Sequence, residues 1–206
     1  MHIEFIDLFR CPEPHEETWL VAAFSRMEER IVIEGRLGCP ICKTEYAIVN
    51  GVVVFGETAA KQGMGATPPS AEAVTRLAAM LGMLRPGMLV LLTGSLAAKS
   101  HELSSLVSGR VLVLNPIPAL VTESESVGSI RTGSTIPVAS RSVDGVALDT
   151  ATDDAIMLGE IVRVLRPGGR LVAPASMSLP GGMRQLARDE QYVVAESVGE
   201  LVNLGR

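Results

Sequence analysis

Hydrophobic residues follow different patterns before and after about residue 70. The later part alternates short, nearly continuous apolar runs with longer amphipathic segments. The amphipathic segments predict helices over 71–84 and 153–165. The apolar runs predict strands over 88–94, 109–115, 143–149 and 170–175. This alternation predicts a mostly parallel sheet with helices covering both of its faces.

Turn signals lie between these elements. Ser70 can cap the first helix. The phrase Leu-Arg-Pro-Gly occurs at 84–87 and again at 165–168, where we expect each copy to end a helix and begin a strand. The last apolar segments, 191–197 and 200–205, are expected to pair as antiparallel strands.

The first 55 residues have a different pattern. Segments 3–9 and 30–37 are expected to be strands. Segment 16–29 is expected to be a helix, because its apolar residues recur at helical spacing. The stretch 45–55 predicts a hairpin, since Asn50-Gly51 suits the positive φ angles of a two-residue turn.

Composition divides the chain between these two patterns. Residues 56–70 are rich in Gly, Pro, Ala, Ser and Thr, which is typical of a linker. We therefore expect a small domain over 1–55, a linker over 56–70 and a larger domain over 71–206. Aromatic residues make up 3% of the chain and apolar residues 47%, so the core is expected to be aliphatic.

Charge and cysteine content exclude several functional classes. The net charge of −5 argues against direct nucleic-acid binding. The chain shows neither a signal-peptide pattern nor an apolar run long enough to span a membrane, so we expect a soluble, cytoplasmic protein. Its three cysteines lie within the first 42 residues and do not make a disulfide framework there. They are candidate ligands or simple thiols.

Two family resemblances emerge from particular phrases. Residues 153–175, including Glu160-Ile-Val-Arg-Val-Leu-Arg-Pro-Gly-Gly-Arg-Leu-Val172, resemble the late helix–turn–strand of class I S-adenosylmethionine (SAM)-dependent methyltransferases. This resemblance extends over roughly residues 70–206. The first 55 residues resemble the small zinc-ribbon proteins that activate tRNA, rRNA and protein methyltransferases. The matching segments are Leu8–Pro12, Gly35–Cys42, Tyr46–Ile48 and Asn50–Val52.

Together, the resemblances imply an α/β protein. A small zinc-ribbon-like α+β domain would precede a Rossmann-like methyltransferase sheet that is mostly parallel, with an antiparallel last strand.

Zinc sites usually take two ligands from each of two tight turns. Cys39-Pro-Ile-Cys42 supplies one turn, and the activator resemblance implies that the other lies in Cys11-Pro-Glu-Pro-His15. Cys11, His15, Cys39 and Cys42 would then make a structural Cys3His site. Two alternatives stay open: one ligand has been lost and three reduced thiols remain, or Glu13 or Glu16 substitutes as a ligand.

The methyltransferase resemblance also implies where SAM would bind. The family carries an acidic residue and Gly-x-Gly-x-Gly after its first strand, and a carboxylate after its second. Here Leu92-Thr93-Gly94-Ser95-Leu96-Ala97-Ala98 keeps one glycine, and Asn115 replaces the carboxylate. Thr93, Gly94, Ser95 and Asn115 are the candidate cofactor residues, in a SAM site that we interpret as eroded.

Other polar residues suggest no chemistry on spacing alone. We expect Asp144 and Asp149 to be solvated carboxylates at strand ends, and His101 to be a lone surface histidine. No residue pair has the spacing of a nucleophile and its base, so no catalytic residue is assigned.

Three hypotheses about function follow. The first is a non-catalytic methyltransferase-like module that acts through protein contacts, with a protein partner or as a homodimer. Apolar residues of the ribbon hairpin, Ile48, Val52 and Val54, would form its contact surface. The second is an active SAM-dependent methyltransferase with an atypical cofactor loop. The third is a Rossmann-like domain that binds another small ligand in the same crevice.

Overall fold

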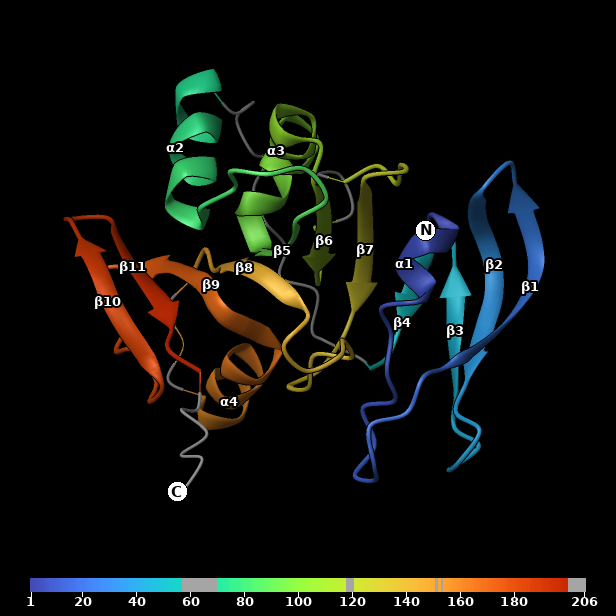
Figure 1. The fold of residues 1–206 in the computed structure, drawn as a ribbon. Helices are drawn as coiled ribbons and strands as arrows, with labels where there is room; N and C mark the ends of the chain where they lie inside the picture. Colours follow the sequence, from blue (N-terminus) through green and yellow to red (C-terminus); the bar gives the residue numbers. More distant parts are fainter. Residues whose placement is uncertain (57–69, 118–120, 151, 153, 200–206) are drawn as a thin grey trace.

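The computed structural model describes residues 1–56, 70–117, 121–150, 152 and 154–199. Most of the expected linker and all of the expected strand over 200–205 lie outside these residues. An eleven-stranded mixed sheet runs through the whole molecule, in the order β1-β2-β3-β4-β7-β6-β5-β8-β9-β11-β10 (Figure 1).

The helices are α1 (Ile3–Ile6), α2 (Ala71–Leu81), the 3₁₀ helix η1 (Gly94–Lys99), α3 (Ser100–Val107) and α4 (Ala155–Val164). The strands are β1 (Val21–Glu28), β2 (Ile31–Gly38), β3 (Glu45–Val49), β4 (Val52–Val54), β5 (Leu89–Thr93), β6 (Arg110–Leu114), β7 (Val127–Arg131), β8 (Val143–Ala147), β9 (Leu165–Pro174), β10 (Met183–Arg188) and β11 (Tyr192–Ser197).

The strands after residue 70 form a Rossmann-like sheet. β7, β6, β5, β8 and β9 are parallel and lie in the order 3-2-1-4-5 when numbered from β5. β11 pairs antiparallel with β9, and β10 pairs antiparallel with β11. The expectation of a mostly parallel sheet with an antiparallel last strand is therefore confirmed.

Alternate residues of the parallel strands face two hydrophobic cores. Val90 and Leu92 of β5 belong to a core with α2 and α3. Leu89 and Leu91 belong to the opposite core, which also contains residues of α1 and α4. α2 and α3 lie together above the sheet in Figure 1, and α4 lies below it. Both faces are covered, so the strands are apolar on both sides.

The N-terminal strands extend the same sheet. β1, β2, β3 and β4 form an antiparallel meander, in which Asn50 and Gly51 make the predicted tight turn with φ of 50° and 82°. β4 then pairs in parallel with β7, with Val53 opposite Ile130. Met1, Phe5 and Phe9 pack into the core that also holds Leu112 and Ile130. One continuous core therefore joins the N-terminal residues to the Rossmann-like strands.

Two local predictions for the N-terminal part were wrong. Segment 3–9 contains the one-turn helix α1, whose first turn is capped by the His2 side chain. Within segment 16–29, Val21–Glu28 form β1 and no helix is present. Its apolar residues recur at helical spacing but are largely exposed, and pairing with β2 determines its conformation instead.

The hairpin does not offer the expected contact surface. Ile48 is buried, and Val52 and Val54 are partly buried. β4 is paired on both sides, with β3 and with β7. The outermost N-terminal strand is β1, and it carries several of the exposed apolar side chains.

Four further elements were not predicted. These are η1, α3, β7 and β10. β10 is largely exposed and carries three polar side chains, so it lacks the apolar run that marks the other strands. Among the described residues, β11 therefore pairs antiparallel with β9 and with β10, which precedes it in the chain.

The two Leu-Arg-Pro-Gly segments meet at one carboxylate. The first lies in the loop before β5 and the second at the start of β9, and Asp144 belongs to β8, which pairs with both strands. Arg85 of the first segment lies 3.4 Å from Asp144, and Arg166 of the second segment also forms an ion pair with it. The Leu89 backbone N–H donates to the same carboxylate at 2.7 Å. Asp144 is 7% exposed, so the prediction of a solvated carboxylate was wrong.

Among the residues that the structure describes, no helix has the length and apolarity needed to cross a membrane.

Candidate metal centre and cofactor crevice

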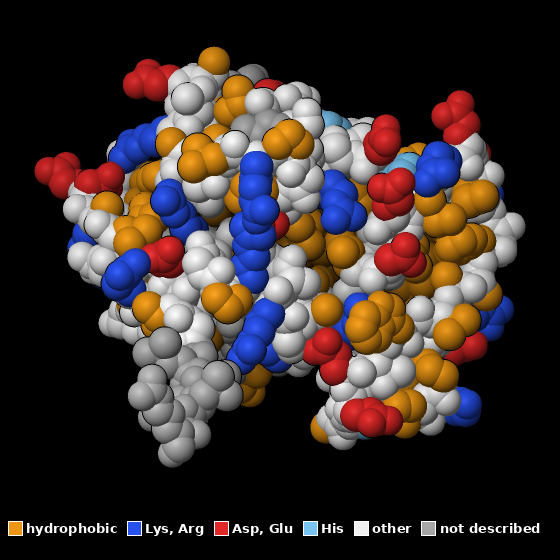
Figure 2. Space-filling view, in the orientation of Figure 1, with side chains coloured by type: hydrophobic (Ala, Val, Ile, Leu, Met, Phe, Trp, Pro, Cys, Tyr) orange, Lys and Arg blue, Asp and Glu red, His pale blue; other side chains and the backbone are white. Residues whose placement is uncertain are grey.

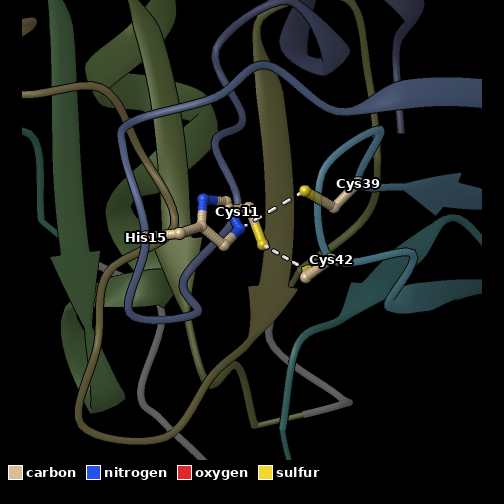
Figure 3. A group of neighbouring side chains, drawn as sticks. All are labelled: Cys11, His15, Cys39 and Cys42. Atoms are coloured by element: carbon tan, nitrogen blue, oxygen red, sulfur yellow. Dashed lines mark hydrogen bonds between the residues drawn. The ribbon is translucent and has the colours of Figure 1, made fainter.

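Two chain segments bring the four predicted metal ligands together. Cys11 and His15 lie in the loop after α1, and Cys39 and Cys42 lie in the turn between β2 and β3 (Figure 3). The ligand atoms of all four side chains lie within 4.8 Å of one another. This group does not include Glu13 or Glu16. The Glu13 carboxylate instead accepts a hydrogen bond from the Tyr46 hydroxyl at 3.4 Å.

Backbone hydrogen bonds shape both ligand-bearing segments. The Cys39 N–H donates to the Thr44 carbonyl at 2.9 Å, and the Lys43 N–H donates back to the Cys39 carbonyl at 3.1 Å. Lys43 has a φ of 63°, which closes the turn tightly. On the opposite side, the Cys11 N–H donates to the Thr18 carbonyl at 2.9 Å. Each pair of ligands is therefore held by a closed local loop.

The distances between ligand atoms suit tetrahedral zinc. Cys11 Sγ lies 3.7 Å from Cys42 Sγ, and Cys39 Sγ lies 3.4 Å from His15 Nε2. Tetrahedral zinc with ordinary bond lengths requires about 3.8 Å between two sulfurs and about 3.6 Å between sulfur and nitrogen. Three thiols and an imidazole are also the donor set that zinc favours. The residues present therefore fit a closed, structural zinc site.

Neighbouring polar groups orient these ligands. His15 Nδ1 lies 2.7 Å from the Glu16 carbonyl, which can only accept, so Nδ1 carries the proton and Nε2 faces the cluster. Cys42 Sγ lies 3.3 Å from Thr44 Oγ1, and Cys11 Sγ lies 3.4 Å from the Tyr46 hydroxyl. Tyr46 was missed as a site residue. Its sequence signals were the Tyr46–Ile48 match to the activator family and its position on a strand immediately after the Cys39–Cys42 turn.

The environments of the thiols differ. Burial raises the pKa of Cys11 to about 11. Hydrogen bonds from Thr44 lower the pKa of the exposed Cys42 to about 6. The hydrogen bond with the Glu16 backbone raises the pKa of His15, and burial raises the pKa of the Tyr46 hydroxyl. The cluster thus combines one thiol that ionises readily with one that needs a cation nearby to ionise.

An ion-pair network fastens the Cys11–His15 loop to the Rossmann-like sheet. A cavity of about 200 Å³ separates the loop from residues 135–138 and α4. Arg163 of α4 pairs with Glu160 at 2.7 Å and lies 3.8 Å from Glu17 of the loop. Glu17 also accepts hydrogen bonds from the Ser140 hydroxyl and backbone N–H at 2.6 and 3.1 Å. The candidate metal centre therefore lies at the junction of the two parts.

The candidate cofactor residues lie where a Rossmann-like sheet binds ligands. The strand order reverses between β5 and β8, and ligands bind in such sheets outside the carboxyl ends of the strands at that point. Thr93 ends β5, Gly94 follows it with a φ of 52°, and Ser95 lies in η1. Asp149 follows β8 across the same crevice.

Asp149 occupies this crevice. Its carboxylate accepts hydrogen bonds from the Ser95 backbone N–H at 2.8 Å and from the Thr93 hydroxyl at 3.1 Å. Its own backbone N–H donates to Thr93 Oγ1 at 3.2 Å. The carboxylate lies so close to Gly94 that a Cβ at that position would overlap it. Asp149 is a partly exposed carboxylate after the end of β8, as expected, but it also contacts a residue 56 positions away, and spacing gives no sign of that contact.

Asn115 is also engaged in a backbone contact. It follows β6, next to Leu114, which is in register with Thr93 of β5. Its side-chain oxygen accepts a hydrogen bond from the Thr132 N–H at 2.8 Å, which caps the end of β7. Its φ of 52° is one that asparagine tolerates better than most residues.

In this structure the polar groups of the crevice are paired with one another. The donors that a cofactor would contact, the Ser95 amide and the Thr93 hydroxyl, are held by a carboxylate of the chain itself. A groove of about 220 Å³ lies beside it, between α2, η1 and the start of β11. Among the described residues its lining includes Leu96 and Lys99, but not Thr93, Gly94, Ser95 or Asn115.

No family model matches the sequence, and no curated protein matches it either. Several solved structures are similar to the chain. One is a putative methyltransferase from an antibiotic biosynthesis pathway of Anabaena variabilis, with 19% identity, a TM-score of 0.45 and coverage of 52% of this chain and 46% of the other.

Two further solved structures have similar sequence identities and TM-scores. TrmN from Thermus thermophilus has 17% identity and a TM-score of 0.45, with coverage of 61% of this chain and 48% of the other. The antibiotic-resistance methyltransferase Kmr has 12% identity and a TM-score of 0.45, with coverage of 68% and 97%. The chain spans about half the length of the first of these proteins. The assignment of a Rossmann-like fold rests on the strand order described above.

Proposed function

We propose that this chain is a non-catalytic, methyltransferase-like accessory module that acts through protein–protein contacts. In this proposal, zinc bound by Cys11, His15, Cys39 and Cys42 has a structural role, because four protein ligands leave no open position for a substrate. The observation that carries the proposal is the closed crevice, where Asp149 holds the Ser95 amide and the Thr93 hydroxyl.

The arrangement of the N-terminal strands supports a role as a built-in partner. The activator proteins that this part resembles act on separate methyltransferases. Here β4 extends the Rossmann-like sheet by pairing with β7, and α1 contributes to the core beneath it. We infer that the N-terminal part stabilises the methyltransferase-like part within one chain, and that zinc fixes the loop through which the two parts meet.

The outer edge of β1 is the surface we assign to a partner. Val21 is 64% exposed, Met27 48% and Phe24 37%, and β1 is the end strand of the sheet. Hydrophobic side chains gather over the N-terminal strands in Figure 2. An exposed apolar edge strand can add a strand of another protein or of a second copy. The proposal therefore includes a protein partner or a homodimer at β1.

Calorimetry tests the central claim. The full chain, purified with its metal, is titrated with SAM and with S-adenosylhomocysteine, and no binding heat is expected. Dissociation constants in the micromolar range, about −8 kcal/mol, would instead favour an active methyltransferase with an atypical loop. A thermal-shift screen of other small metabolites addresses the third hypothesis, a Rossmann-like domain with a different ligand. A stabilising hit that Ser95→Pro abolishes would support that hypothesis.

Light scattering coupled to size exclusion tests the contact surface. If the chain is a homodimer through β1, Phe24→Lys should make it monomeric. Leu84→Lys is the matched control, because Leu84 is 86% exposed and lies in the loop between α2 and β5. Equal effects of the two substitutions would count against β1 as the interface.

A further inference from the structure

We propose that Asp149 is an internal ligand that keeps a latent carboxylate-binding site closed. This inference rests on the proposed function and deepens it, because it explains the closed crevice by one residue. It predicts that the site opens when the Asp149 side chain is removed, and that it then takes up a small molecule carrying a carboxylate group.

The contacts around Asp149 are those of a bound carboxylate. One oxygen accepts from the Ser95 backbone N–H at 2.8 Å, and the other accepts from the Thr93 hydroxyl at 3.1 Å. The donors come from β5 and the start of η1, and the acceptor comes from the loop after β8. The donors and the carboxylate that they bind therefore come from opposite sides of the crevice. In this respect the carboxylate is placed like a ligand in a binding site.

The backbone beneath the carboxylate is shaped to admit it. Gly94 lies between Thr93 and Ser95, and any side chain there would overlap the Asp149 carboxyl group. Its φ of 52° is also one that glycine adopts without strain. The single glycine of this loop is therefore used for close approach of a carboxylate. That carboxylate is now supplied by the chain.

Removing the side chain leaves the donors in place. Thr93 is held by its pairing with Leu114, and the other side of β5 is paired with β8. An Asp149→Ala chain keeps the Ser95 amide and the Thr93 hydroxyl, but it lacks their acceptor. Thr93 is partly buried and Ser95 is exposed. Two donors that converge on one point favour binding of a substitute acceptor, and an ionised one most strongly.

Chemical rescue tests this inference. Unfolding temperatures of the wild type, Asp149→Ala and Asp149→Asn are measured in sodium acetate and in sodium chloride at equal ionic strength. Asp149→Ala is expected to unfold at a lower temperature than the wild type. Acetate should raise its unfolding temperature by a few degrees more than chloride does, because a ligand that binds the folded state stabilises it. The wild type and Asp149→Asn keep an acceptor in place and should show no such difference.

A second titration separates this inference from the proposed function. S-adenosylhomocysteine, which carries a carboxylate, is titrated into the wild type and into Asp149→Ala. Binding to the variant at least about tenfold tighter than to the wild type is expected. Binding to the wild type in the micromolar range would overturn the proposed function. An acetate response shared equally by all three chains, or its absence from Asp149→Ala, would overturn the internal ligand and leave the proposed function standing.

Discussion

The candidate metal centre and the cofactor crevice are both places where distant segments bring polar side chains together, but their chemistry is opposite. In the metal centre, three sulfurs and one imidazole nitrogen present lone pairs to a common point. In the crevice, the Asp149 carboxylate faces two hydrogen-bond donors. Like groups that converge need an external cation. Complementary groups satisfy one another, and the site closes without a ligand.

This difference decides which site we expect to be occupied. The cysteine thiols and His15 have weak interactions with one another, at 3.4 to 3.7 Å, and burial disfavours ionisation of Cys11. A divalent cation removes both costs. Ser95, Thr93 and Asp149 already have their partners, so a ligand for the crevice must first displace a carboxylate. We therefore expect the four-ligand cluster, and not the crevice, to bind a ligand from outside the chain.

The largest expected effect comes from removing a metal ligand. Structural zinc contributes roughly 10–16 kcal/mol in small zinc-binding peptides. Cys39→Ala is expected to reduce bound zinc from about one atom per chain to less than about 0.2 and to destabilise the loop that carries Cys11. The measurement is zinc analysis of the purified chain together with its unfolding temperature before and after chelation.

His15 offers a matched comparison. His15→Ala should weaken zinc binding, whereas His101→Ala should not, because the ring of His101 contacts the Thr122 carbonyl outside the cluster. Less than about 0.2 zinc per wild-type chain would contradict the metal site and favour three reduced thiols.

The next largest effect concerns a carboxylate that satisfies its neighbours. Asp144→Ala removes the acceptor shared by Arg85, Arg166 and the Leu89 N–H. Removing one partner of a buried ion pair costs about 3–5 kcal/mol of stability. Because both arginines are partly exposed, we expect the free energy of unfolding to fall by about 3 kcal/mol. Urea denaturation measures it.

Arg85→Ala is the control for that loss. The Arg85 side chain is 61% exposed, so its removal should cost less than about 1 kcal/mol. Equal losses for Asp144→Ala and Arg85→Ala would show that the shared carboxylate is not what joins the two Leu-Arg-Pro-Gly segments.

Much of the fold was predictable because buried strands and helices carry a clear pattern of apolar residues in the sequence. The apolar runs marked β5, β6, β8 and β9, and the amphipathic stripe with Ser70 as its cap marked α2. Edge elements were less predictable. β1 and β10 have few buried side chains, and partner strands determine their conformation. Local sequence cannot report such pairing.

The two sites were unequally predictable for a related reason. Cysteine and histidine are uncommon and chemically distinctive, so Cys11, His15, Cys39 and Cys42 could be singled out without a structure. Asp149 is an ordinary residue, and its importance comes from a contact with Ser95 across the crevice. Tyr46 has the same limitation, because its hydroxyl approaches Cys11 through tertiary packing alone.

Asn115 gives a further test of what closes the crevice, because its side-chain oxygen accepts a hydrogen bond from the Thr132 backbone N–H. Asn115→Gly removes that acceptor while tolerating the φ of 52°, and loss of one hydrogen bond should cost about 1 kcal/mol. Asn115→Asp restores an acceptor with the charge that the methyltransferase family carries at this position. It should still bind no SAM, since Asp149 remains in the crevice. If calorimetry detected SAM binding to Asn115→Asp but not to the wild type, the residue that prevents SAM binding would be Asn115 and not Asp149.

The smallest expected effect is the acid sensitivity of the turn between β10 and β11. The Asp189 carboxylate accepts from the Tyr192 and Gln191 backbone N–H groups at 2.8 and 2.7 Å, and it pairs with Arg76 at 2.7 Å. These backbone hydrogen bonds, followed by Arg76, lower the pKa of Asp189. A lowered pKa in the folded state means that the stabilisation is present above the unfolded value, about 3.9, and is lost as the pH falls through the folded value. The difference in stability between the wild type and Asp189→Asn should therefore be constant near neutral pH and shrink below about pH 4. Arg76→Ala is the control, and the difference is measured by urea denaturation from about pH 3 to 7. This variant should keep most of the pH dependence, because the backbone donors are the larger cause of the lowered pKa. If Arg76→Ala lost all of the pH dependence, the effect would belong to the ion pair instead.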